Sequence, residues 1–109
     1  MTVTTAIVAG DDADGLGSAL EAEGVETTYI DTPASADSMD EAGLASADLF
    51  VLTNLDDATA IPLAKELNPD VRVVVYAHDT LPEFAKGQAD LAVDPNLLGP
   101  DVVAEELVA

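Results

Sequence analysis

Short apolar, β-branched segments alternate along this chain with segments of helical spacing, and this alternation constrains the fold more than any other feature. The clearest strand pattern is VRVVVYA at residues 71–77, and further strands are predicted at 3–9, 25–30, 48–53 and 89–93. Strands separated by helices require crossover connections. We therefore predict an α/β, Rossmann-like three-layer fold with a parallel five-stranded sheet in the order 3-2-1-4-5 and helices on both faces.

Helical segments are predicted at 15–23, at 32–46, between Asp57 and Asn68, at 81–87 and at 100–108. The segment at 32–46 has only Met39 and Leu44 as sizeable apolar anchors, which predicts a short, weakly packed helix. Pro62 interrupts the third pattern, so that helix should be kinked or should begin late, with the proline in its first turn.

Length and composition favour one domain covering residues 1–109, because a chain of 109 residues is of ordinary domain size. Hydrophobic residues make up 49% of the chain and aromatic residues only 4%, so the core must consist mainly of aliphatic side chains. The absence of cysteine excludes disulfides, thiolate metal sites and cysteine nucleophiles. No apolar run approaches the roughly 20 residues that cross a bilayer, so we expect a cytoplasmic protein without membrane insertion.

The charge balance is extreme: 22 acidic residues face three basic ones, for a formal net charge of −19. Such a chain repels nucleic-acid phosphates and anionic lipids, so neither is an expected partner. Concentrated salt shortens the Debye length to about 3 Å and weakens the self-repulsion of the chain. The composition resembles that of proteins from salt-accumulating haloarchaea.

The turn after the first predicted strand reads Gly10-Asp11-Asp12-Ala13-Asp14-Gly15. It has the outline of the dinucleotide fingerprint G-x-G-x-x-G, with Asp12 in place of the middle glycine. A carboxylate at that position opposes a pyrophosphate, because two like charges repel by about 1 kcal/mol at close range even in bulk water. Asp31 stands 21 residues after Gly10, where an acid would bind an adenosine ribose, or else it caps a turn.

Residues 47–104 carry a longer pattern, in which a strand ends in a Thr/Asp-rich turn and a helix leads to Asn-Pro and another strand. With Gly10, Gly15 and Asp31, this pattern resembles the Trk N-terminal or RCK-type nucleotide-binding domains that regulate potassium transport. The resemblance implies NAD or an adenine nucleotide as cofactor, with Gly10, Asp12, Gly15, Asp31 and Asn54 as candidate contacts.

Two functions follow from this resemblance. The first is a stand-alone regulatory or adaptor module with a degenerate dinucleotide site, acting on a protein partner or as a homodimer formed through the last helix. The alternative is an adenine-nucleotide sensor for NAD, ATP, ADP or AMP, acting on a potassium transporter or another partner. Titration of these nucleotides distinguishes the two.

Acidic strand ends suggest a further hypothesis, in which Asp11, Asp12 and Asp56 or Asp57 hold Mg²⁺. A phosphoacceptor receiver domain has such an acidic pair after its first strand. A receiver also needs an Asp ending the third strand, a Ser or Thr ending the fourth and a Lys after the fifth. The sequence has Asn54, Ala77 and Asp94 there, so phosphotransfer is not expected.

His78, the single histidine, lies at the end of the fourth predicted strand and is a candidate general base. No nucleophile partner is evident in the sequence, and no serine stands in a nucleophile-elbow pattern. We therefore do not predict an enzyme.

Overall fold

The computed structural model of the chain describes residues 4–78 and 87–108. Its strands are β1 (Thr5–Ala9), β2 (Glu26–Ile30), β3 (Leu49–Leu52), β4 (Arg72–Tyr76) and β5 (Leu91–Val93). Its α-helices are α1 (Leu16–Ala22), α2 (Ala36–Glu41), α3 (Ala60–Leu67) and α5 (Pro100–Val108). Two 3₁₀ turns, Leu44–Ser46 and Leu55–Asp57, precede β3 and α3. The helix predicted at 81–87 lies outside the described residues, except for its last residue.

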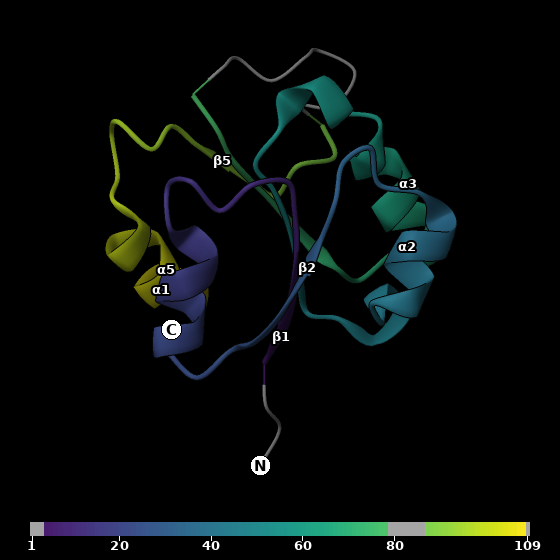
Figure 1. Cartoon of the computed structure of the whole chain (residues 1–109), viewed down its shortest axis with the longest axis horizontal. Coiled ribbons are helices and arrows are strands. Elements are labelled where there is room, and N and C mark those ends of the chain that lie inside the picture. Colours follow the sequence, from purple (N-terminus) through teal and green to yellow (C-terminus); the bar gives the residue numbers. More distant parts are fainter. Residues whose placement is uncertain (1–3, 79–86, 109) are drawn as a thin grey trace.

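All the described strands are parallel and form one five-stranded sheet in the order β2-β1-β3-β4-β5. Figure 1 shows α1 and α5 on one side of this sheet and α2 and α3 on the other. The predicted α/β fold, with a parallel five-stranded sheet and helices on both faces, is therefore confirmed.

The predicted strand order 3-2-1-4-5 is wrong, because β1 pairs with both β2 and β3 and the chain crosses over β1 between them. Residue character explains the observed order. All of β3 is buried, as a central strand must be, whereas β2 (ETTYI) contains no buried residue and lies at an edge. Periodicity locates strands along the chain but does not say which of them are neighbours.

The core consists of two apolar layers, because successive side chains of each strand point to opposite faces of the sheet. One layer joins Ile7, Phe50 and Val73 to the helices on the α2 and α3 side. The other joins Val8 and Val51 to α1 and α5. Both layers are mainly aliphatic, with Phe50 in the first and Tyr76 in the second, as the low aromatic content requires.

The predicted shortness of the helix before β3 and the predicted late start of the next helix are confirmed. Met39 and Leu44 anchor the segment between β2 and β3, which forms only the six-residue α2 and a 3₁₀ turn. The helix α3 begins at Ala60, so Pro62 lies in its first turn, where a proline removes no hydrogen bond. No helix in the described ranges is long and apolar enough to cross a membrane.

Candidate functional site

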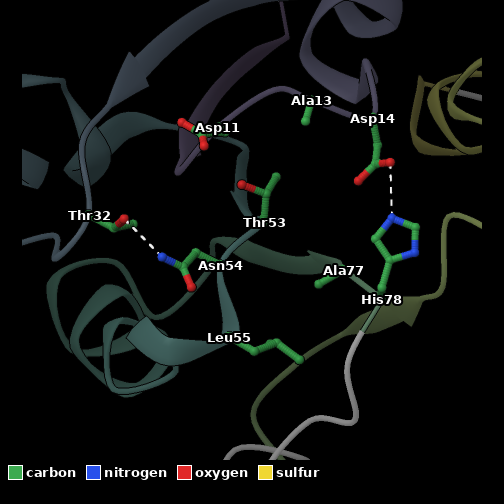
Figure 2. A pocket seen from close by; sticks show the side chains of 9 residues that line it. All are labelled: Asp11, Ala13, Asp14, Thr32, Thr53, Asn54, Leu55, Ala77 and His78. Carbon is green, nitrogen blue, oxygen red and sulfur yellow. Dashed lines mark hydrogen bonds and ion pairs between the residues drawn. The ribbon is translucent and has the colours of Figure 1, made fainter.

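The carboxyl ends of the strands meet at one edge of the sheet and enclose a hollow of about 280 Å³. Figure 2 shows the side chains that line it. They come from the loops after β1, β2, β3 and β4, and they are Asp11, Ala13, Asp14, Thr32, Thr53, Asn54, Leu55, Ala77 and His78. Among these residues the only ionisable groups are two carboxylates and one imidazole.

Gly10 serves the packing of β1 against β3. Its φ is +107°, and a Cβ at this position would collide with the hydroxyl of Thr53. The backbone N–H of Gly10 donates to the carbonyl of Ile30 at 3.1 Å, which extends the β1–β2 ladder by one bond. A glycine is therefore required here whether or not the loop binds a ligand.

Asp12 caps α1. Its carboxylate accepts hydrogen bonds from the N–H of Gly17 at 2.7 Å and from the N–H and hydroxyl of Ser18, each at 3.1 Å. The adjacent Gly15 has the left-handed conformation, with φ +81°, that turns the chain into the helix. In dinucleotide-binding folds, the N–H groups of the first helical turn are free to bind phosphate. Here the carboxylate of Asp12 already accepts from two of them.

Asp31 and Asn54 lie in different places. Asp31 lines an open groove of about 390 Å³ beside α2, together with Tyr29, Ile30, Pro33, Ser35, Ser38, Glu41 and Ala42. Asn54 lines the hollow, where its amide donates to the hydroxyl of Thr32 at 3.2 Å and accepts from the N–H of Asp56 at 3.0 Å. Of the five predicted nucleotide contacts, only Asn54 lines the hollow, and nucleotide contact by the five stays a prediction.

The acids proposed for magnesium do not converge. Asp11 lines the hollow, but Asp12 is engaged at α1 and the buried Asp57 accepts from the N–H of Ala34 at 2.8 Å. Within the described ranges, no three acidic or histidine side chains are arranged so that they could hold a metal ion together. Asp12 and Asp57 instead hold two different segments of backbone, the start of α1 and the loop after β2.

His78 connects the loop after β1 to the loop after β5. Its Nε2 lies 3.1 Å from Oδ1 of Asp14, and its Nδ1 lies 3.2 Å from the side-chain nitrogen of Asn96 and 3.7 Å from Oδ1 of Asp94. In the neutral ring, Nε2–H donates to Asp14 and Nδ1 accepts from Asn96. These three partners were not found from the sequence, because they are brought to His78 from loops far away in the chain.

A second contact, made by Tyr76, holds the loop after β5. Tyr76 is fully buried at the end of β4, and its hydroxyl donates to the carbonyl of Leu98 at 2.9 Å. Burial raises the pKa of this phenol, and the carboxylates of Asp14 and Asp101 raise it further. The hydroxyl is therefore held as a neutral donor over the physiological range of pH.

Comparison with known proteins adds a family and a fold. The model of a family described as "Family of unknown function (DUF7126)" matches residues 6–107. No curated protein matches the chain.

Among solved structures, the chain is similar to an orphan response regulator of H. pylori, with a TM-score of 0.69, 14% identity and coverage of 98% of this chain and 94% of that one. It is also similar to a response regulator of Burkholderia multivorans, with a TM-score of 0.59, 18% identity and coverage of 98% and 94%. A candidate pilus assembly-related protein of Burkholderia pseudomallei gives a TM-score of 0.63, 17% identity and coverage of 97% and 87%.

These neighbours correct the resemblance to the Trk N-terminal and RCK-type domains, which is wrong, and with it the predicted function as a module or sensor of that type. Two of the structures reported above are response regulators, and the strand order β2-β1-β3-β4-β5 is that of the flavodoxin-like folds. The sequence pattern was misleading because Gly10 and Asp31 follow strands and Gly15 precedes a helix, and glycines and acids at such positions also suit other parallel α/β folds. Their spacing does not distinguish one strand order from another.

Proposed function

The chain belongs to the family of unknown function DUF7126, and from the geometry of its site we propose that it is a receiver-like signalling module that acts by associating with a partner, without accepting a phosphoryl group. The proposal rests on one observation. The two residues that follow β3 into the hollow are Thr53 and Asn54, a hydroxyl and an amide, whereas phosphoryl transfer to a receiver needs a carboxylate nucleophile there.

The other positions support this proposal. Ala77, at the end of β4, brings no hydroxyl to the hollow, and Asp94, after β5, brings a negative charge where a receiver has a lysine. Phosphoryl transfer depends on cations that neutralise the developing charge of the phosphoryl oxygens. Two carboxylates, Asp11 and Asp14, line the hollow instead, and no lysine or arginine is among its described lining residues.

Association is the mode of action that remains for a module of this kind. Three of the large apolar side chains exposed in the described part of the chain, Leu97, Leu98 and Val102, lie on the loop after β5 and the first turn of α5. His78 and Tyr76 hold this loop against the site. A change at the hollow would therefore be transmitted to a surface able to contact a protein, and one domain of residues 1–109 suffices for this role.

Treatment with acetyl phosphate and MgCl₂ in concentrated KCl, followed by intact-mass spectrometry, tests the central claim. We expect no gain of a phosphoryl group by the wild-type protein, while a receiver domain with the usual aspartate gains one in the same buffer. A stable gain of a phosphoryl group by the wild-type protein would refute the proposal. Sedimentation equilibrium of wild type and Leu97→Ser in the same buffer measures whether self-association contributes.

A further inference from the structure

We propose that the free edge of β2 is a docking site for an extended, lysine- or arginine-rich segment of a partner protein, which would add to the sheet as a sixth strand. The proposal concerns a different surface from the hollow and does not depend on the function proposed above. It rests on the backbone of β2, on the groove beside it and on the distribution of charge.

The backbone of β2 has hydrogen-bonding groups that β1, its single neighbour among the described strands, does not use. The N–H of Glu26 donates to the carbonyl of Thr4 at 2.9 Å, and the carbonyl of Ile30 accepts from Gly10 at 3.1 Å. Alternate residues of a strand point their backbone groups to the same side, so residues 26, 28 and 30 face β1. The N–H and C=O groups of Thr27 and Tyr29 therefore face away from the sheet.

The strand carries few of the features that protect sheet edges from pairing. Residues 26–30 (ETTYI) contain no proline, lysine or glycine, and their paired register with β1 runs without a bulge. Thr, Tyr and Ile favour extended backbone. An edge of this kind is suited to pairing with another strand, which is a common way for sheets to bind peptides.

The groove beside this edge fits a side chain with an apolar stem and a positive end. Ile30, Pro33 and Ala42 supply apolar surface within its volume of about 390 Å³, while Asp31 and Glu41 supply carboxylates. Alternate side chains of an added strand point to one face of the sheet. Lysine or arginine at alternate positions would lay its methylene groups on the apolar surface and its charge beside the acids.

Charge selects this partner over a second copy of the chain. No lysine or arginine precedes Lys65 in the sequence, so the only charged side chains of α1, β2 and α2 are acids. Glu26 is exposed on β2 itself. Two copies meeting at this edge would bring two acidic surfaces together, whereas a basic strand would neutralise one.

The test uses an acetylated, amidated heptapeptide of alternating lysine and valine, titrated into the ¹⁵N-labelled full chain at the lowest KCl concentration that keeps the native circular dichroism. We expect saturable binding of one peptide, slower hydrogen exchange at the amides of Thr27 and Tyr29, and weaker binding as KCl rises. A peptide with glutamate in place of lysine should not bind.

Two variants of Thr27 separate the outward N–H from the threonine side chain. Thr27→Pro removes this donor without touching the bonds to β1, and should weaken binding by at least about tenfold, the loss of one or two backbone hydrogen bonds. Thr27→Val keeps the donor and should bind within about twofold of wild type. If Thr27→Pro does not fold, the peptide methylated on alternate backbone nitrogens provides the same test against the wild-type protein.

Several results would overturn the proposal. They are the absence of binding, binding that Thr27→Pro and the N-methylated peptide leave unchanged, and binding that the glutamate peptide shares. Slow exchange at Thr27 in the protein alone, with a concentration-dependent dimer in sedimentation, would assign the edge to a second copy. Because none of these results involves phosphoryl transfer, they leave the function proposed for the hollow unaffected.

Discussion

The two ends of the sheet use polar side chains in different ways. At the amino ends of the strands, Asn68 is buried and its amide nitrogen donates to the carbonyls of Leu44 at 2.9 Å and Ala47 at 3.0 Å. At the same end, Lys65 donates to the carbonyl of Val71 and pairs with Asp90. These contacts tie helices and strands of the core to each other.

At the carboxyl ends, the polar side chains bind loops instead. Asp12 caps α1, Asn54 joins the loops after β2 and β3, and His78 joins the loops after β1 and β5. About half of the His78 side chain is exposed, so water can replace its partners. The comparison teaches that the same residue types stabilise the core at one end and position a surface at the other.

The largest expected effect is that of Asn68→Ala at the amino end. The substitution leaves two buried carbonyl groups without a donor, and we expect it to lower the free energy of unfolding by about 2–3 kcal/mol. Urea unfolding in molar KCl measures this, because urea does not alter the ionic strength. The matched variant at the carboxyl end, Asn96→Ala, should change it by no more than about 0.5 kcal/mol. Equal losses of unfolding free energy in Asn68→Ala and Asn96→Ala would show that polar side chains stabilise the two ends of the sheet to the same extent.

At the carboxyl end, Asp12→Ala should have the largest effect. It removes a helix cap that accepts from two backbone N–H groups, and such a loss costs about 1–2 kcal/mol. Asp11→Ala removes the neighbouring charge, which accepts no hydrogen bond among the described contacts, and should be neutral or slightly stabilising. Urea unfolding, together with faster hydrogen exchange at Gly17 and Ser18 in Asp12→Ala alone, measures the difference. If both variants lose equally, Asp12 does not act as a cap.

The fold could be predicted from the sequence, and the site only in part. Buried strands such as β3 and β4 are continuous apolar runs, and α5 has clear helical spacing, so their positions follow from periodicity alone. The strand order depends on which strands pack side by side. The polar residues of β2 mark it as an edge strand, and this signal is present in the sequence.

The candidate site was harder to predict because its contacts join residues far apart in the chain. The prediction that Asp12 opposes a pyrophosphate follows from its charge alone, whereas its bond to Gly17 depends on the loop geometry. His78 was identified as a candidate, whereas its contacts with Asp14 and Asn96 span 64 and 18 residues. Side-chain chemistry can be read from a sequence, but the partner that engages each side chain cannot.

A smaller effect at the amino end concerns Asp90 and acid pH. Burial raises the pKa of Asp90, but the hydrogen bonds from Lys65 and the N–H of Val73 outweigh it, so the net pKa is lowered from 3.8. An acid with a lowered pKa stabilises the fold above its unfolded value, and this stability is lost as pH falls through the folded value. We expect Asp90→Asn to cost about 1 kcal/mol at pH 7, discounted because the pair is partly exposed.

The measurement is the difference in unfolding free energy between wild type and Asp90→Asn from pH 7 down to pH 2. That difference should stay constant to about pH 4 and then shrink. Using the difference removes the contribution of the other acids, whose repulsion also changes with pH. A difference that is independent of pH would contradict the proposed pairing.

The smallest expected effect is that of Tyr76→Phe at the carboxyl end, about 0.5–1 kcal/mol, because the carbonyl of Leu98 belongs to a surface loop that water can reach. Burial and the neighbouring acids raise the pKa of Tyr76, so its contribution to stability is present below pH 10 and is lost as pH rises through the folded value. Wild type should therefore lose stability above pH 10 more steeply than Tyr76→Phe in urea unfolding.

Tyr29→Phe is the control. Burial, Asp12 and Glu21 raise the pKa of Tyr29 too, but Tyr29 is 45% exposed. Tyr29→Phe should not reduce the loss of stability above pH 10 as much as Tyr76→Phe does if the buried hydroxyl holds the loop after β5. Equal reductions would show that it does not hold this loop. The coupling of the hollow to Leu97 and Leu98 would then depend on His78 alone.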